Sequence, residues 1–142
     1  MPNLASKVFS AYRVGQRAEF FQTISEKMVR DFARLSGDQN PLHTKKAYAK
    51  TTAFGRTIAH GMLGGALFSR LIGMYLPGKN SLYLQQTLKF RKPIFPGARV
   101  AVTGEIINKS ESMSLLTIRT IICNKKSGEI FTEGEALVKL LK

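Results

Sequence analysis

Residues 57–76 read TIAHGMLGGALFSRLIGMYL, and this stretch decides the fold. Its apolar side chains spread around most of a helix, and a helix that is apolar nearly all round is buried. These side chains are Ile58, Met62, Leu63, Ala66, Leu67, Ile72 and Tyr75. The glycines at 61, 64 and 65 each cost about 1 kcal/mol relative to alanine inside a helix, a cost that close approach of backbone or ligand would offset. We therefore predict a buried helix that ends at Pro77-Gly78.

A shorter amphipathic helix is expected before the buried one, after a strand at residues 17–21. The stretch Thr23-Ile24-Ser25-Glu26 has the pattern of a capping box, with a hydroxyl at the cap and a carboxylate three residues on. Gly37 is expected to end the helix, and a loop from Asp38 to His43 follows because Pro41 disfavours a helical residue before it. The apolar face of this helix carries Met28, Val29, Phe32 and Leu35.

The rest of the chain reads as consecutive strands separated by short turns. Such strands form an antiparallel sheet. The expected strands lie at residues 82–91, 99–108, 113–123 and 129–140. A sheet of this length that wraps one buried helix is the α+β arrangement of a single hotdog fold, which we expect to occupy residues 1–142 as one domain. Its unpaired edge predicts a homodimer.

The composition is strongly basic, with 22 Lys and Arg against 9 Asp and Glu and a formal net charge of +13. Such a charge favours acidic partners, including nucleic acid, an anionic membrane, an acidic carrier protein or a phosphate-bearing cofactor. The cations are spread along the chain without interleaved aromatic residues, so we expect no nucleic-acid partner and interpret most of the charge as solvated surface.

Cysteine content and hydropathy exclude several classes of protein. Cys123 is the single cysteine, which excludes an intrachain disulfide, and one Cys with 2 His excludes the usual Cys/His zinc frameworks. The longest largely apolar run, Thr57 to Ser69, falls short of the ~20 residues that a membrane span needs. We therefore expect no metal, no membrane association and a cytoplasmic location, or the mitochondrial matrix in a eukaryote.

The stretch from Ser36 to His43 carries the chemistry. It places the carboxylate of Asp38 and the imidazole of His43 on one short segment, with Pro41 between them to turn both toward one point. A carboxylate can hold a water and take its proton, and an imidazole can accept or return a proton near neutral pH. Taken alone, this loop fits an ordinary helix exit with a surface histidine better than a catalytic site.

The start of the buried helix favours the catalytic interpretation. The first amides of a helix have no partner within it and point outward at the positive end of the dipole. With no side chain, Gly61 leaves its N–H open to an incoming oxygen, as an oxyanion site for a thioester carbonyl requires. We interpret the neighbouring His60 as a packing or hydrogen-bonding residue that supports the loop, not as a catalyst.

These residues together resemble the signature of MaoC-like hydratases, also called hydratase type 2. The likeness covers Ser36 to His43, Tyr48 to Gly55 and Ile58 to Leu63, and it continues through the strands, so that it spans about residues 12–142. The closest resemblance is to short, single-hotdog (R)-specific enoyl-CoA hydratases of the kind that supply polyhydroxyalkanoate synthesis.

The resemblance implies a hydro-lyase of fatty acid metabolism that acts on an acyl-CoA substrate. Asp38 and His43 would hold a water that attacks C3 of a trans-2-enoyl-CoA, while a proton is delivered to C2, giving the (R)-3-hydroxyacyl-CoA by syn addition. The Gly61 amide would bind the thioester oxygen, and Asn40 and His60 would support the loop. No cofactor and no metal is implied beyond the coenzyme A that the substrate carries.

An acyl pocket is expected along the buried helix. Ser69 and Ile72 are three residues apart and share a helix face beyond Gly61, and the resemblance suggests that Leu137 of the last strand closes the far side. Because Ile72 and Leu137 are bulky, we expect a preference for acyl chains of about four to six carbons, since each further CH₂ gains ~0.8 kcal/mol only where room exists. The alternative is that all three are ordinary core residues.

Two other functions stay open from the sequence. Dehydration of a (R)-3-hydroxyacyl-ACP in fatty-acid synthesis would use the same loop, and the positive charge would suit an acidic acyl carrier protein. A noncatalytic binding module for an acidic partner would also explain the charge, although it has no need of a water-holding pair. Salt-dependent DNA binding without hydratase activity would favour the binding module.

Overall fold

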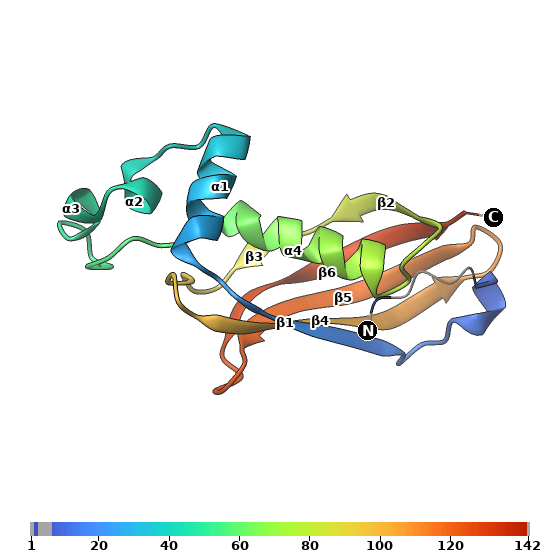
Figure 1. The fold of residues 1–142 in the computed structure, drawn as a ribbon. Helices are drawn as coiled ribbons and strands as arrows, with labels where there is room; N and C mark the ends of the chain where they lie inside the picture. Colours follow the sequence, from blue (N-terminus) through green and yellow to red (C-terminus); the bar gives the residue numbers. More distant parts are fainter. Residues whose placement is uncertain (1, 3–6, 142) are drawn as a thin grey trace.

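Helix α4 lies along one face of an antiparallel sheet in the computed structural model, which describes residue 2 and residues 7–141 (Figure 1). The segment that carries the three shorter α-helices, residues 26–56, projects past one end of the sheet, and we call it the helical lobe (Figure 1). Within the described part of the chain, no helix is long and apolar enough to cross a membrane. In chain order the elements are η1 (Phe9–Ala11), β1 (Arg17–Thr23), α1 (Glu26–Ser36), α2 (Pro41–Thr44), α3 (Lys46–Ala49), α4 (Gly61–Met74), β2 (Ser81–Gln86), β3 (Lys89–Phe90), β4 (Arg99–Ser110), β5 (Leu115–Asn124) and β6 (Ile130–Leu140).

The sheet confirms the expected α+β hotdog class. Its six strands run in the order β1-β4-β5-β6-β2, and β3 pairs with β6. All pairings are antiparallel. The strand expected at residues 82–91 is divided into β2 and β3, because the chain passes directly over Gly134 of β6. A Cβ at Gly134 would stand 1.8 Å from the carbonyl oxygen of Thr87. The backbone at Thr87 can therefore pass this close to β6 only because residue 134 is a glycine.

The core lies between α4 and the sheet. A Cβ on Gly64 would lie 3.0 Å from Cδ1 of Ile122, which confirms the close approach expected at this glycine. The prediction that the helix is buried all round is wrong for the single chain, since Met62 is 57% exposed and Ala66 and Ser69 are also exposed. One sheet covers only one side of a helix, so the opposite stripe is left open. The buried side chains of α4 are Leu63, Leu67, Phe68, Leu71 and Ile72.

Helix α1 differs from the sequence prediction at its start and on its face. Its N-cap is Ser25, whose side chain accepts a hydrogen bond from the Met28 N–H, so the predicted capping box from Thr23 to Glu26 is wrong by two residues. Leu35 is 87% exposed and does not join the buried face. The predicted end of α1 is confirmed, because Gly37 follows the helix in the left-handed conformation with φ of 80°.

Part of the segment expected to be a loop is helical. The Asn40 side chain accepts a hydrogen bond from the Leu42 N–H, and Pro41 occupies the first helical position of α2. Proline is favoured at that position because its missing N–H would have no partner there. His43 therefore lies on a short helix and not on the predicted loop.

Candidate active site

Asp38 is held directly after the end of α1. One oxygen of its carboxylate, Oδ1, accepts a hydrogen bond of 3.1 Å from the Asn40 N–H. Asn40 in turn caps α2, as described above. The rest of the carboxylate stays accessible, since the Asp38 side chain is 51% exposed. The segment thus presents a fixed, ionisable acceptor at the surface of the helical lobe, with Asn40 connecting it to the helix that carries His43.

The tautomer of His43 is set by a backbone carbonyl. Its Nδ1 lies 2.8 Å from the carbonyl oxygen of Ile58. Because a carbonyl oxygen can only accept a hydrogen bond, Nδ1 carries the proton and Nε2 keeps a lone pair. A half-buried imidazole with a free Nε2 lone pair can accept a proton from water. Ile58 was not singled out by the sequence analysis, because a backbone acceptor has no residue-type signal.

The structure brings Asp38, His43 and His60 together. Each offers a carboxylate oxygen or ring nitrogen, and these atoms all lie within 4.8 Å of one another. Two such groups at this separation can share one water through hydrogen bonds of about 2.8 Å each. The His43 and His60 rings are stacked, with centroids 4.0 Å apart and an interplanar angle of 28°. The lone pairs of stacked rings do not converge on one point, so the arrangement suits a water better than a metal ion.

Gly61 is the first residue of α4, where helix geometry supplies no acceptor for its N–H. Beside it is a cavity of about 380 Å³ whose walls include Ile58, His60, Phe90 and Lys92. The Phe90 ring lies against Gly61, and a Cβ on Gly61 would stand 2.8 Å from the ring atom Cε1. The cavity therefore reaches the helix start where an oxyanion would be stabilised. Phe90 was not anticipated from the sequence, because only the pairing of β3 with β6 places it there.

We expect Gly61→Val to lower the hydration rate far more than the free energy of unfolding. The added Cβ would press on the Phe90 ring, which is 52% exposed and can move, and the side chain would crowd an oxygen that approaches the amide. Loss of one oxyanion donor costs roughly 100-fold in kcat. Steady-state kinetics and urea unfolding on the same samples check this. Outright unfolding of Gly61→Val would show that the glycine serves helix packing instead.

The structure does not bring Ser69, Ile72 and Leu137 into one pocket. Ile72 is buried in the core beside Ala136 and Val138 of β6. Leu137 lies between those two residues in the strand, and successive side chains of a strand point to opposite faces, so Leu137 faces away from α4. Ser69 is exposed. The three side chains do not line one pocket within the single chain, and their contact with substrate stays a prediction.

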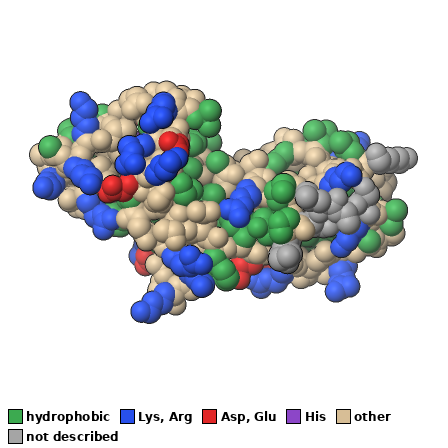
Figure 2. Space-filling model, in the orientation of Figure 1, with side chains coloured by type: hydrophobic (Ala, Val, Ile, Leu, Met, Phe, Trp, Pro, Cys, Tyr) green, Lys and Arg blue, Asp and Glu red, His purple; other side chains and the backbone are tan. Residues whose placement is uncertain are grey.

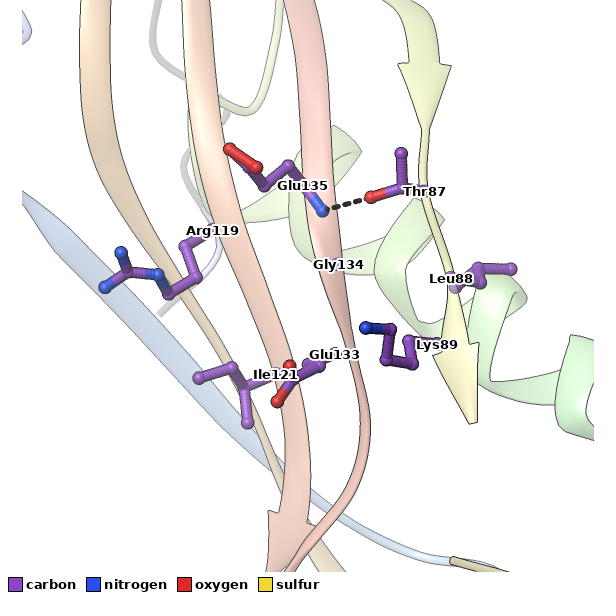
Figure 3. Close-up of a pocket in the computed structure, with 8 residues that line it drawn as sticks. All are labelled: Thr87, Leu88, Lys89, Arg119, Ile121, Glu133, Gly134 and Glu135. Carbon is purple, nitrogen blue, oxygen red and sulfur yellow. Dashed lines mark hydrogen bonds between the residues drawn. The ribbon is translucent and has the colours of Figure 1, made fainter. Parts of the chain in front are cut away.

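A second hollow lies on the opposite face of the sheet from α4 (Figure 3). Its volume is about 410 Å³, and Lys89, Arg119, Glu133 and Glu135 line it. In Glu133 the hydrogen bond from Arg91 lowers the pKa of the carboxyl group. The lining of this hollow includes none of Asp38, His43, His60 and Gly61, so it is separate from the candidate active site.

The family model described as MaoC like domain matches residues 10–123. This chain therefore belongs to the MaoC-like family, whose signature the Asp38 loop and the start of α4 resemble.

Two curated relatives and one solved structure are similar to this chain over most of its length. The (R)-specific enoyl-CoA hydratase of Aeromonas caviae is 45% identical over 127 residues, which cover 89% of this chain and 94% of the relative. The enzyme of the same name from Rhodospirillum rubrum is 39% identical, covering 92% of this chain and 89% of its own. The solved (R)-hydratase from A. caviae, described as involved in PHA biosynthesis, superposes with a TM-score of 0.88 at 44% identity, covering 92% of this chain and 98% of that one.

Proposed function

We propose that this protein is an (R)-specific enoyl-CoA hydratase, which adds water to a trans-2-enoyl-CoA to give the (R)-3-hydroxyacyl-CoA. The proposal rests mainly on two observations: a ring nitrogen of His43 and a carboxylate oxygen of Asp38 lie within 4.8 Å of each other, and the Ile58 carbonyl fixes the His43 tautomer that leaves a lone pair on Nε2. Relatives that are named (R)-specific enoyl-CoA hydratases support the substrate and the stereochemistry.

The geometry suggests how the residues share the reaction. The water between Asp38 and His43 loses a proton to His43 Nε2 as its oxygen bonds to C3 of the enoyl group. Negative charge then develops on the thioester oxygen, where the Gly61 N–H and the positive end of the α4 dipole would stabilise it. Transfer of that proton from His43 to C2 completes the addition and returns His43 to its neutral form.

Coenzyme A fits the proposal better than an acyl carrier protein, because the relatives named (R)-specific enoyl-CoA hydratases are 45% and 39% identical to this chain. The charge does not separate the two substrates. The helical lobe carries seven cations and three acidic residues, and Figure 2 shows Lys and Arg gathered over it. This charge suits the phosphates of coenzyme A and also an acidic carrier. A mitochondrial 3-hydroxyacyl-[acyl-carrier-protein] dehydratase of tomato is 30% identical over 90% of this chain, which keeps the carrier as the alternative substrate. The cations are Lys27, Arg30, Arg34, Lys45, Lys46, Lys50 and Arg56.

The test is to follow loss of the enoyl thioester with crotonyl-CoA and with crotonyl-carrier protein at equal concentrations. We expect a higher kcat/KM with the CoA thioester and no change after dialysis against a chelator, since the proposed chemistry uses no metal and no cofactor. A higher kcat/KM with the carrier would favour the dehydratase alternative. Loss of activity on chelation would contradict the metal-free mechanism. The cytoplasmic location stays a prediction.

We expect a homodimer in solution. β2 lies at the edge of the sheet, where Leu82 and Leu84 are 45% and 48% exposed, and Met62 and Phe90 are further exposed apolar side chains. An apolar, unpaired edge is stabilised by a second copy. Sedimentation at micromolar concentration should give a dimer, and Leu84→Lys should shift the equilibrium toward monomer. A wild-type monomer at that concentration would contradict the prediction.

A further inference from the structure

His60 is placed where it contacts both members of the proposed catalytic pair. Its side chain is buried, with the residue 4% exposed, and it directly precedes α4. The ring nitrogen Nε2 lies 3.0 Å from the backbone carbonyl oxygen of Asp38. Because that oxygen only accepts, Nε2 carries the proton. The His60 side chain thus fixes the backbone from which the Asp38 carboxylate extends.

The His43 ring stacks against the face of the His60 ring. The two imidazoles are stacked at 4.0 Å, and the Phe32 ring also contacts His60, with centroids 4.9 Å apart. The hydrogen bond from Nδ1 to Ile58 fixes one edge of the His43 ring, and the stack fixes the plane of that ring. Together they determine the direction of the Nε2 lone pair.

Neither nitrogen of His60 is available for proton transfer. Nε2 is engaged by the Asp38 carbonyl, and Nδ1 is buried without a hydrogen-bond partner among the residues that the structure describes. His60 lines the cavity beside Gly61, but it presents no free ring nitrogen there with which to exchange a proton. Its contacts are those of a residue that acts through others.

The segment that carries His60 is itself anchored at several points. The Ile58 N–H donates to the Leu42 carbonyl at 3.4 Å, and the Ala59 N–H donates to the Ile94 carbonyl at 2.8 Å. Gly61 follows immediately as the first residue of α4. One short segment therefore connects the proton-transfer pair to the candidate oxyanion donor.

We propose that His60 is a positioning residue, which holds the Asp38 carboxylate and the His43 imidazole in register with the Gly61 amide for water addition. The inference rests on the proposed hydratase function. It assigns the two contacts of His60 to separable roles, because the hydrogen bond sets the Asp38 backbone and the ring stack sets the plane of His43.

Three variants separate these roles. His60→Gln keeps an amide that can donate to the Asp38 carbonyl but has no ring, whereas His60→Phe keeps a ring but cannot donate. His60→Ala loses both. We expect kcat to fall about tenfold in each of the first two and about 100-fold in His60→Ala, with KM within about twofold, because misplacement by ~1 Å can cost 100-fold in rate. Ile118→Val, in the core cluster away from this site, is the control for a general loss of packing.

A second readout does not depend on activity. The chain has 2 His, so in His60→Ala the remaining ¹⁵N-histidine signal belongs to His43. Wild-type His43 should show the Nδ1–H tautomer. In His60→Ala the ring is no longer held in the plane that directs Nδ1 at the Ile58 carbonyl, so both tautomers should be populated. If His43 keeps wild-type shifts and kcat per folded molecule stays within about twofold, His60 is only a packing residue and the inference is overturned. If wild-type protein hydrates no enoyl-CoA, the proposed function fails, and the tautomer of His43 still decides whether His60 positions it.

Discussion

Asp38→Asn and His43→Asn should each lower kcat for hydration by about 100-fold or more, the usual cost of removing a proton-transfer group. Both changes keep the local hydrogen bonds. The amide oxygen of Asn at 38 can still accept from the Asn40 N–H, and the amide of Asn at 43 can still donate to the Ile58 carbonyl in place of Nδ1. Each substitution removes the group that exchanges a proton with water. His43→Gln removes the same lone pair, so its kcat should fall by a similar factor.

Steady-state kinetics with crotonyl-CoA measure this effect, and thermal unfolding of the same samples provides the control. The unfolding midpoints should stay close to wild type, because neither side chain lies in the core. Turnover near the wild-type rate in either asparagine variant would remove that residue from the catalytic pair.

Gly134→Ala should destabilise the fold severely, although it adds only one methyl group. The new Cβ would stand 1.8 Å from the Thr87 carbonyl oxygen, which belongs to backbone and cannot turn aside as a side chain can. Overpacking ordinarily costs about 1–3 kcal/mol, and we expect the upper end of that range or more. Because domains are stable by only about 5–15 kcal/mol, much of the chain would then be unfolded in mild urea.

The matched control is Gly73→Ala in α4, where an added Cβ meets no atom within 4 Å. Alanine is favoured over glycine in a helix by up to about 1 kcal/mol, so this variant should be more stable than wild type. Urea unfolding at one fixed protein concentration compares the two, because dimerisation would make stability depend on concentration. Equal free energies of unfolding in Gly134→Ala and wild type would contradict the crossing of Thr87 over β6.

The sequence predicted the features that depend on local pattern or on residue type. Gly37 ends α1 as expected because a left-handed residue after a helix favours glycine. The antiparallel strands followed from their spacing. The approach of Asp38 to His43 followed from a short segment with a proline between them, and the structure shows their polar atoms close together.

Features set by tertiary contacts could not be predicted from the sequence. Thr23 and Ser25 both offer a capping hydroxyl, and only the path of β1 into α1 selects Ser25. The spacing of Ser69 and Ile72 predicted a shared helix face, but the burial of Ile72 against β6 is fixed by the sheet. Leu137 was assigned to the pocket by resemblance, and the alternation of β6 turns it to the other face. The sequence predicted His60 as a packing or hydrogen-bonding residue that supports the loop, but its contacts with the Asp38 carbonyl and the His43 ring depend on the tertiary structure.

The central claim is tested most directly by the product formed from crotonyl-CoA and purified protein. The proposed function predicts that water adds at C3 and that the product is (R)-3-hydroxybutyryl-CoA, as shown by chiral analysis after thioester hydrolysis. Formation of the (S) product would contradict the stereochemical assignment. Absence of hydration by folded wild-type protein would contradict the hydratase function itself.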